Sequence, residues 1–494
     1  MLQDCNIRCA ASGLSLSHAR TNQLVDDAVV WANQHGLVVA LKDPAFVNPE
    51  LAVIHAPLAL TPVPYPRTRF ELAQQVMPLF NSLIDAVASD EAYLETVLRP
   101  AAQHDAFTAR LLRVLCASRG RRAALRAAGR EVVLGVHRSD YMLDQPSGTF
   151  LQVELNTIAS SFGCLSALMT RLHAYMASRA GGLDASRLPA NPALEHIPDA
   201  LAAAAAASGH VEAGGVVVMV VQPGERNAYD QQWIQLQLWE RHRLRTLRLT
   251  LADIAAGAVV DEASGTLRLG GEEGQPPVCV FYFRAGYTPS DYPSEVEWAA
   301  RELIEASNAA KCPTVAYQLA GTKKVQQDLA APGVLERFTT DPRDAALLRE
   351  FFAGLWSLDP VDLAADGAAA TAVADALQRP EAYVLKPQRE GGGNNLYGEE
   401  LRAALQAGGE QLSAFILMQR ILPPVNKSVL VRNGRWQEAE TLSELGIYGT
   451  FVRHGDEVIL NKQSGHLVRT KTSSSNEGGV AAGFAVLDSP YLVD

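Results

Sequence analysis

Short apolar runs alternate with polar loops and amphipathic segments along most of the chain. The run at 216–221 predicts a buried strand, and a polar loop at 222–227 and a helix rich in Gln, Leu and Trp follow it. A second apolar run at 278–283 predicts the next strand of the same unit. This alternation is typical of an α/β layout with loops at the strand ends.

Polar side chains follow both of these predicted strands. Glu225, Arg226 and Asn227 come after the first strand, and Arg284 and Tyr287 come after the second. Open α/β sheets bind ligands at the carboxyl ends of their strands, so these residues are candidates for a binding site. Taken singly, each of them is more simply explained as a solvated loop residue.

The segment 294–311 predicts a helix with a structural role. Ser294 and Glu297 form a capping box at its start. Four apolar side chains fall on one expected core face of this helix: Val296, Ala300, Leu303 and Ile304.

The segment FLQVELN at 150–156 alternates apolar and polar residues. Gln152, Glu154 and Asn156 therefore share one face of a predicted strand. A half-exposed strand would show the same alternation, and on the pattern alone a face turned to solvent is the simpler explanation. Glu154 and Asn156 nevertheless supply oxygen ligands of the kind that Mg²⁺ prefers.

The segment YVLKPQREGGGNNLYGE at 383–399 runs from an apolar strand into three glycines and two asparagines. Consecutive glycines let the backbone direct N–H groups at a ligand, Lys386 and Arg389 offset phosphate charge, and Glu390 is placed to hold a divalent cation. A flexible surface turn is the alternative, and the charged and amide side chains around the glycines disfavour it. Neither GxxxxGK[ST] nor GxGxxG occurs, so we expect a nucleotide-binding loop of another kind.

Near the C-terminus, the segment FVRHGDEVILNK predicts a hairpin that turns at 454–456. Arg469 and Lys471 then precede a loop rich in Ser and Gly. Two cations on one face of a strand suit an anion, although a solvated strand explains them equally well.

Composition limits the remaining possibilities. With 494 residues, 48% of them hydrophobic, the chain can bury two or three lobes. A formal net charge of -11 argues against a nucleic-acid surface, so any bound polyanion should be small. Apolar runs too short for a membrane span, six scattered cysteines and no leader-like start predict a reducing, cytoplasmic location.

Several long blocks carry a resemblance to a known family: HRSDYM at 137, VELNTIASSFG at 153, ERNAYDQ at 225, FRAGY at 283, NAAKCPTVAYQLAGTKKVQQ at 308, KPQREGGGNNLYGEE at 386, SELGIYG at 443, HLVRTK at 466 and GGVAAG at 478. From about 134 to 493 the chain resembles the eukaryotic-type glutathione synthetases, which are ATP-grasp ligases. The resemblance implies an α/β protein with an ATP-grasp fold, a Rossmann-like substrate-binding domain and a glycine-rich lid. The implied units are an N-terminal part of the body at 1–212, the substrate-binding domain at 213–320, and a C-terminal part at 321–494 with the lid at about 383–470.

The resemblance also implies site residues. Two Mg²⁺ ions per site would be held by Glu154, Asn156 and Glu390. ATP, the co-substrate, would contact Met142, Glu154, Lys323, Lys386, Pro387, Gln388, Arg389, Glu390, Gly391, Gly392, Gly393, Asn394, Asn395, Tyr397, Met418, Gln419, Arg420, Ile421, Glu444, Lys471 and Glu477. The other substrates would contact Arg138, Ile158, Ala159, Ser160, Ser161, Glu225, Arg226, Asn227, Gln231, Arg284, Ala285, Gly286, Tyr287, Arg469, Val480 and Ala481. The catalytic side chains would be Arg138, Lys386 and Arg469.

The reaction that the resemblance implies joins γ-glutamylcysteine to glycine through an acyl phosphate, with no side-chain nucleophile and a homodimeric enzyme. Two alternatives are a ligase that uses β-alanine or serine as acceptor and a nucleotide-binding relic without turnover. The chain departs from the family pattern at MQRI, where MEKI is common, at IASS, where ISAS is usual, at Ala285, which replaces an acid, and at Glu477, which replaces Asp. These departures concern substrate binding more than the reaction.

Overall fold

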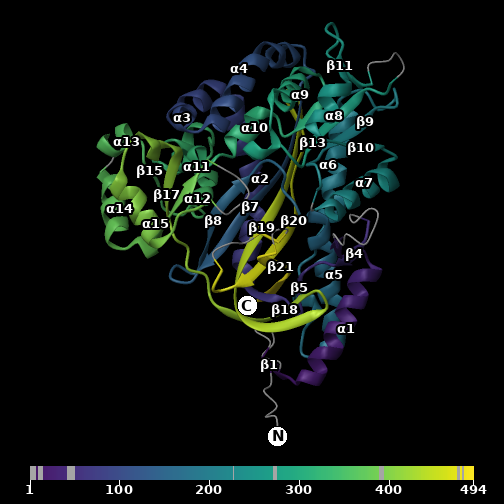
Figure 1. The fold of residues 1–494 in the computed structure, drawn as a ribbon, viewed down its shortest axis with the longest axis vertical. Coiled ribbons are helices and arrows are strands. Elements are labelled where there is room, and N and C mark those ends of the chain that lie inside the picture. Colours follow the sequence, from purple (N-terminus) through teal and green to yellow (C-terminus); the bar gives the residue numbers. More distant parts are fainter. Residues whose placement is uncertain are drawn as a thin grey trace.

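The computed structural model is a mixed α/β protein in which helices cover both faces of one large sheet, with a smaller sheet at its side (Figure 1). The expected α/β class is therefore confirmed. The structure describes residues 7–8, 15–41, 51–225, 227–270, 275–365, 367–388, 394–475, 479–480 and 483–494.

The large sheet has eleven strands among the described residues. In spatial order they are β10 (Thr246–Leu249), β9 (Val216–Val220), β13 (Val278–Phe283), β14 (Ala310–Cys312), β7 (Val132–Asp144), β19 (Arg435–His454), β18 (Asn426–Arg432), β5 (Leu58–Ala59), β21 (Ala485–Asp488) and β20 (Glu457–Thr472), and β8 (Thr149–Asn156) pairs with β7. Because β20 also pairs with β19, the strands β19, β18, β5, β21 and β20 close into a ring.

The first four strands of this order are parallel, as in a Rossmann-like unit. The helices between them are α7 (Ala228–His242), α8 (Leu251–Gly257) and α9 (Glu295–Ala306). The chain passes from β9 to β10 on one side and returns to β13 on the other, so the strand order reverses between β9 and β13. The loops after these two strands therefore start side by side, at the place where such sheets bind ligands.

The strand β9 is apolar throughout because both of its faces are buried. Val216, Val218 and Val220 belong to one core, whereas Val217 and Met219 belong to the other. This two-sided burial explains why the sequence shows a continuous apolar run instead of an alternation.

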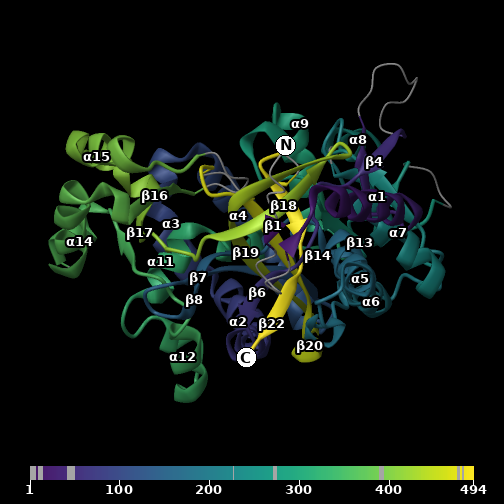
Figure 2. The same ribbon diagram turned by 90° about the horizontal axis from the view of Figure 1, so that it is seen from below.

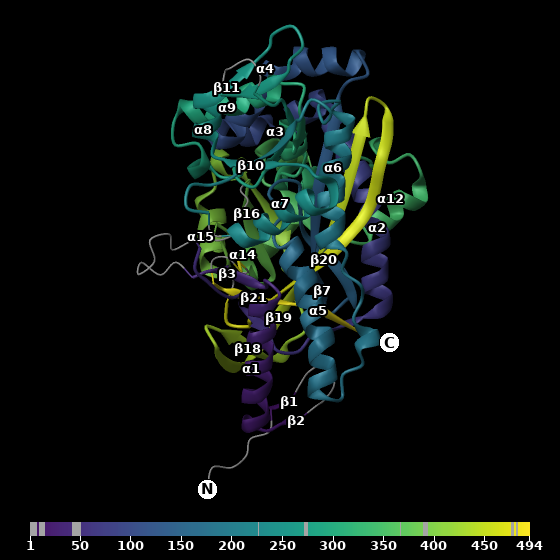
Figure 3. The ribbon, with the colours of Figure 1, turned by 90° about the vertical axis from the view of Figure 1, so that its right-hand side faces the viewer.

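Helices complete the two cores. On one face lie α1 (His18–Gln34), α5 (Gly163–Ala180), α6 (Ala193–Ala207) and α7. On the other face lie α2 (Arg67–Ser89), α3 (Glu91–His104), α4 (Ala106–Ala127), α8, α9, α10 (Val315–Ala320), α11 (Lys323–Ala330) and α12 (Pro342–Arg349). Figure 3 shows the long hairpin of β19 and β20 beside α6 and α2, and it turns between His454 and Glu457 as the sequence predicts.

The small sheet is antiparallel and lies at the opposite side of the molecule from α1 and α7 (Figure 2). Its strands are β15 (Leu355–Ser357), β17 (Phe415–Gln419) and β16 (Tyr383–Pro387), with α13 (Pro360–Ala365), α14 (Gly367–Gln378) and α15 (Gly398–Ala407). Within the range 383–470 expected as a lid, β16, α15 and β17 belong to this small unit, whereas β18 to β20 belong to the large sheet.

The remaining strands form short pairs. They are β1 (Ile7–Arg8) with β2 (Ser15–Leu16), β3 (Val38–Ala40) with β4 (Val53–His55), β6 (Val63–Pro66) with β22 (Pro490–Val493), and β11 (Ala258–Val260) with β12 (Leu267–Leu269). Short 3₁₀ turns lie at Ala185–Arg187, Pro289–Asp291, Leu335–Arg337, Pro380–Ala382 and Glu410–Ala414.

The helix α9 confirms one expectation and corrects another. The capping box between Ser294 and Glu297 is present. Val296, however, is 49% exposed, so its assignment to the core face was wrong. The buried face instead includes Trp298 and the ion-paired Arg301 and Glu305, because a paired charge can be buried where an apolar pattern does not reveal it.

No helix in the described ranges combines the length and the apolar character that crossing a membrane requires. Cys116, Cys164, Cys279 and Cys312 are free thiols.

Candidate functional site

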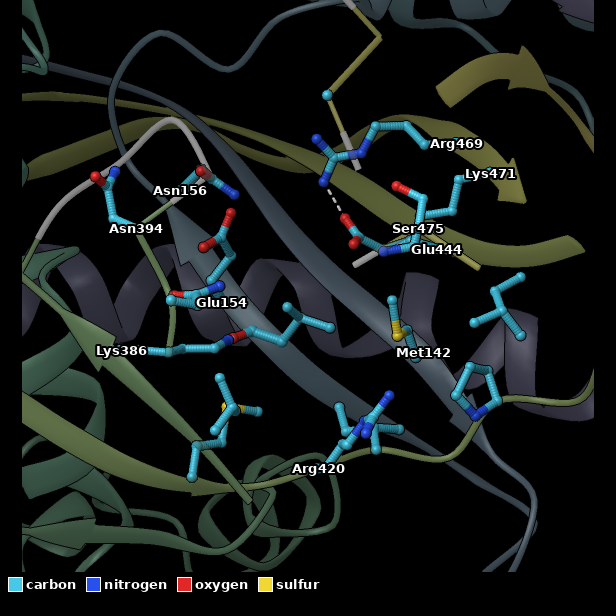
Figure 4. A pocket seen from close by; sticks show the side chains of 18 of the residues that line it. Met142, Glu154, Asn156, Lys386, Asn394, Arg420, Glu444, Arg469, Lys471 and Ser475 are labelled. Carbon is cyan, nitrogen blue, oxygen red and sulfur yellow. Dashed lines mark hydrogen bonds and ion pairs between the residues drawn. The ribbon is translucent and has the colours of Figure 1, made fainter. Parts of the chain in front are cut away.

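A pocket of about 500 Å³ lies between the small sheet and the strands β7, β8, β19 and β20 of the large sheet (Figure 4). Twenty of the expected site residues line it: Arg138, Met142, Glu154, Asn156, Ile158, Ala159, Ser161, Tyr287, Lys323, Lys386, Asn394, Asn395, Tyr397, Met418, Gln419, Arg420, Ile421, Glu444, Arg469 and Lys471. The structure thus brings together segments that are more than 300 residues apart in the sequence.

One end of the pocket is apolar. Val384 of β16, Met418 of β17 and Ile421 pack together in a small core that Met142 of β7 joins. Leu442 of β19 also lines the pocket. Apolar walls of this kind suit an aromatic ring such as a nucleobase.

The lining of the pocket as a whole is rich in cations. It includes six basic side chains, namely Arg138, Lys323, Lys386, Arg420, Arg469 and Lys471, and two acidic ones, Glu154 and Glu444. This excess of positive charge sits inside a chain with a net charge of -11. The pocket is therefore electrostatically suited to a small polyanion.

Two lysines hold the pocket end of β8. Lys323 Nζ, at the start of α11, forms an ion pair of 2.9 Å with Glu154, and Lys386 Nζ on β16 donates to the carbonyl of Val153 at 2.9 Å. Burial alone would raise the pKa of Glu154, but the charges of Lys323, Lys386 and Arg469 outweigh it and hold that pKa well below its ordinary value. Glu154 is therefore a carboxylate over the whole neutral range.

A β-bulge changes the expected alternation in β8. Asp140 is opposite Glu154, and the next residue, Tyr141, is opposite Gln152, so Val153 is the extra residue. Gln152 consequently does not line the pocket and instead donates to the hydroxyl of Ser139 at 2.6 Å. The prediction of a single polar face was thus wrong for Gln152, because a bulge shifts the side-chain alternation by one residue.

Asp140, which sequence reasoning missed, lies directly behind the pocket. Its carboxylate is 1% exposed and accepts hydrogen bonds from Arg138, Asn156 and Arg469. The available signal was the spacing of Arg138 and Asp140, because residues two apart share one face of a strand.

Arg469 contacts a second carboxylate, that of Glu444 on the neighbouring strand (Figure 4). Burial raises the pKa of Glu444 more than the positive charge of Arg469 lowers it. Arg469 therefore lies between Asp140 and Glu444, with one guanidinium nitrogen shared by both acids.

A second cluster of candidate residues lies where the strand order reverses. It consists of Ser160, Asn227, Gln231 and Arg284, each of which is less than 9% exposed. In the described part of the chain, Ser160 Oγ, both amide atoms of Asn227, Gln231 Oε1 and Arg284 Nε have no hydrogen-bond partner. Buried polar groups are rarely left unpaired in a protein, so this cluster suits a polar ligand.

Asp230, the other residue that the sequence analysis missed, organises this cluster. Its carboxylate accepts the backbone N–H groups of Phe162, Cys164 and Leu165 at the start of α5, at 2.8 to 3.3 Å, and lies 3.4 Å from Arg284 Nη1. It thus ties the loop before α5 to the end of β13.

The loop between β8 and α5 joins the pocket to the second cluster. Ile158, Ala159 and Ser161 line the pocket, whereas Ser160, between them, does not, and its hydroxyl is buried. Ala159 (φ 52°) and Phe162 (φ 70°) adopt left-handed backbone conformations, which are uncommon for residues other than glycine and concentrate at functional sites.

Ten expected site residues do not line the pocket: Pro387, Gln388, Ser160, Glu225, Asn227, Gln231, Arg284, Ala285, Gly286 and Val480. Of these, Gln388 Oε1 instead accepts the backbone N–H of Lys324 at 2.8 Å, at the start of α11, and Glu225 accepts that of Asn227 at 2.7 Å. A further eight lie outside the described residues: Arg226, Arg389, Glu390, Gly391, Gly392, Gly393, Glu477 and Ala481.

The pocket also includes lining residues that were not expected: Val153, Val384, Leu422, Pro423, Val425, Leu442, Ser473, Ser475 and Gly479.

Two of the three expected metal ligands, Glu154 and Asn156, lie within the described residues. Glu154 and Asn156 both line the pocket, and Asn156 Nδ2 is occupied by Asp140, so its amide oxygen is the atom left for a cation. No group of three His, Cys, Asp or Glu side chains that could hold a metal occurs within the described ranges. The two oxygen donors fit Mg²⁺, which commonly uses one or two carboxylates together with substrate phosphates.

An apolar recess and several cations between a small antiparallel sheet and a larger one fit the class of ATP-grasp nucleotide-dependent ligases. The family model described as the eukaryotic glutathione synthase ATP-binding domain matches residues 18–492. The chain therefore belongs to the eukaryotic glutathione synthase family.

Known relatives agree with this family. A chloroplastic glutathione synthetase of Solanum lycopersicum is 47% identical over 95% of this chain and 84% of its own length. Glutathione synthetase of Homo sapiens is 40% identical over 89% of this chain and 91% of its own. The apo structure of a glutathione synthetase-like effector from Globodera pallida shares the fold, with a TM-score of 0.72 at 23% identity and coverage of 97% and 98% of the two chains.

Proposed function

We propose that this chain is a glutathione synthetase, an ATP-dependent ligase that joins γ-glutamylcysteine to glycine. The observation that carries the proposal is the contact between two complementary sites, a cation-rich pocket with an apolar end and a cluster of buried polar groups that have no partner within the described chain. ATP would occupy the pocket, with adenine beside Met418 and Ile421. The dipeptide would bind at the cluster, and its cysteinyl carboxylate would lie at the junction.

The reaction proceeds in two steps at that junction. An oxygen of the cysteinyl carboxylate attacks the γ-phosphorus of ATP, the bond to the bridging oxygen breaks, and ADP leaves. The amine of glycine then attacks the acyl phosphate, a tetrahedral intermediate forms, and phosphate leaves as the amine loses its proton. Arg138, Arg469 and Lys386 stabilise the negative charge that moves between these oxygens, which is the main contribution that a preorganised site makes.

Glu154 and Asn156 would hold Mg²⁺, with Glu390 as the third ligand. A bound Mg²⁺ would neutralise charge on the phosphate oxygens. Glu154→Gln should weaken the Mg²⁺ dependence of ATP binding and leave the binding of metal-free ADP unchanged, which calorimetry measures directly. Equal loss of both would contradict a role in metal binding.

Of the three substrates, the amino acid that accepts the acyl group is the one that the site residues specify least. Val480, expected to contact one of the two amino-acid substrates, is 4% exposed and packs in the core, and it does not line the pocket. One additional methylene changes affinity by only about 1–3 kcal/mol, so β-alanine or serine is the closest competitor.

Phosphate release tests the function and the acceptor together. Purified protein with ATP, Mg²⁺ and γ-glutamylcysteine is assayed with glycine, β-alanine, serine or no acceptor. Lys386→Met should abolish release, whereas Lys427→Met, a change of the exposed lysine on β18, should not. Release only with another amino acid would reassign the acceptor, and ATP binding without release would support the nucleotide-binding relic.

Two further properties belong to the proposal. A homodimer is the expected assembly, and sedimentation of the purified chain tests it. The cytoplasm is the expected compartment because the four described cysteines are free thiols. The relative from Solanum lycopersicum is described as chloroplastic, so localisation of a tagged full-length chain decides between the two compartments.

A further inference from the structure

A single buried carboxylate contacts three pocket side chains that come from three different strands. Asp140 Oδ1 accepts Arg138 Nε at 2.6 Å, and Oδ2 accepts Arg138 Nη2 at 2.7 Å, Asn156 Nδ2 at 3.0 Å and Arg469 Nη2 at 3.1 Å. Arg138 shares β7 with Asp140, whereas Asn156 belongs to β8 and Arg469 to β20. Asp140 therefore connects the parts of the junction that the large sheet supplies.

The geometry fixes the orientation of Arg138. Two parallel hydrogen bonds to one carboxylate hold the guanidinium in the plane of that carboxylate. The remaining nitrogen, Nη1, is 3.4 Å from the carbonyl of Ser161, in the loop that joins the pocket to the second cluster. Arg138 can therefore present only its outer edge to a ligand at the junction.

The negative charge of Asp140 also allows two guanidinium groups to face one ligand. Arg138 and Arg469 are both largely buried, and two such guanidinium groups would repel each other at short distance. A carboxylate bonded to both offsets that repulsion and leaves their outer edges free to share an anion. The same carboxylate orients Asn156, because it accepts from Nδ2 and leaves the amide oxygen for the pocket.

A glycine on the neighbouring strand provides the space for this arrangement. Gly446 of β19 lies opposite Asp140 in the antiparallel register. A Cβ atom at Gly446 would lie 2.7 Å from Asp140 Oδ1 and 2.8 Å from Arg138 Cδ, closer than non-bonded atoms allow. A residue with a side chain at this position would therefore displace the pair.

We propose that Asp140 is a positioning residue that holds Arg138, Asn156 and Arg469 in one geometry at the junction. A glycine at position 446 is required because any side chain there would displace Asp140. The inference rests on the proposed function, because it assigns these three side chains to the dipeptide carboxylate and to the phosphoryl group that is transferred. Asp140 itself touches neither substrate.

The test compares Asp140→Asn with the wild-type enzyme. The amide nitrogen of the variant cannot accept a hydrogen bond, so at least one of the three side chains loses its acceptor. We expect kcat/KM for γ-glutamylcysteine to fall about 10–100-fold, which is typical when a residue that orients a site is replaced. The fall should combine a higher KM for the dipeptide with a lower kcat. ADP affinity without divalent cation should be unchanged, because Asp140 bonds to no side chain at the apolar end of the pocket.

Two further variants separate positioning from general stability. Gly446→Ala keeps the charge of Asp140 but displaces its carboxylate. This variant should also show a higher KM for the dipeptide together with a lower kcat. Asp488→Asn removes another buried carboxylate of the same sheet, whose bonds to Thr470 and Ser489 involve no pocket residue, and should leave the dipeptide KM unchanged. Asp140→Glu should not restore activity, because the longer side chain cannot form both bonds to Arg138.

Opposite outcomes would overturn the proposal. Wild-type kcat/KM in Asp140→Asn would show that the three donors need no common acceptor. Equal loss of ADP binding and dipeptide binding would show a purely structural role. If the wild-type chain binds the dipeptide but does not ligate glycine to it, the proposed function is contradicted. The role of Asp140 is still tested in that case, because calorimetry compares the dipeptide affinity of Asp140→Asn with that of the wild type without turnover.

Discussion

Lys323 Nζ lies 2.9 Å from the carboxylate of Glu154, although 168 residues separate the two in the sequence. One residue begins α11 and the other lies at the pocket end of β8. The pair places a cation that is expected to contact ATP against a carboxylate that is expected to hold the metal.

Replacement of Lys323 tests this pair. Lys323→Met removes a cation from the phosphate end and leaves a partly buried Glu154 without its closest partner. We expect the KM for ATP to rise about 10–100-fold, since hydrogen bonds to charged groups contribute about 1.5–3 kcal/mol. Steady-state kinetics with varied ATP measures the effect, and Lys427→Met serves as the matched control. An unchanged KM would remove Lys323 from the proposed nucleotide site.

Asp488 predicts a pH dependence of stability. Burial raises the pKa of Asp488 to about 7, although hydrogen bonds from Thr470 and Ser489 lower it. The native state therefore keeps a proton that the unfolded chain, with an ordinary pKa of 3.8, releases. Because the native state binds more protons between these two values, this contribution to stability falls as the pH rises from 3.8 to about 7.

The substitution Asp488→Asn should remove that dependence. The variant cannot ionise, so its melting temperature relative to wild type should rise as the pH increases from about 4 to about 7. Differential scanning calorimetry across this range measures the difference. A constant difference at every pH would mean that Asp488 has the same pKa in both states.

Asp230 should contribute to dipeptide binding through α5 and Arg284. Asp230→Asn keeps the size of the side chain but removes the charge that faces Arg284 and the helix N-terminus. Such a charge contributes about 0.3–2 kcal/mol at a helix end. We expect a lower melting temperature and weaker binding of γ-glutamylcysteine, with nucleotide binding preserved.

An exposed helix cap provides the control for Asp230. Asp253 caps α8 through Thr250 and has no pocket contact. Asp253→Asn should lower stability without an effect on dipeptide affinity. If Asp230→Asn and Asp253→Asn bind the dipeptide equally well, Asp230 acts only as a helix cap.

Gln419 is the second residue of the segment MQRI at 418–421, which departs from the family pattern MEKI. Gln419 Oε1 accepts the backbone N–H of Gly354 at 3.1 Å, a bond that a glutamate can also make. Gln419→Glu should therefore leave the KM for ATP nearly unchanged. Gln419→Ala should raise it about 3–10-fold through loss of one hydrogen bond of about 0.5–1.5 kcal/mol. A large effect of the glutamate would show that the amide N–H₂ group contacts the nucleotide.

Much of the local structure was determined by the sequence alone. The apolar runs predicted β9 and β13, Ser294 and Glu297 predicted the cap of α9, and the turn near 455 predicted the hairpin of β19 and β20. These features depend on neighbours within a few residues, which periodicity and turn chemistry report directly. The family resemblance added the candidate residues, because long blocks specify identity at each position.

Only the tertiary structure decided how these pieces meet. The bulge at Val153 separates Gln152 from Glu154, and Asp140 and Asp230 receive their partners from strands and helices far away in the sequence. A buried carboxylate is stable only with donors around it, and those donors come from packing that no local pattern records. The sequence therefore determined which charged side chains are present, and the packing of the sheets and helices decided which of them pair with one another.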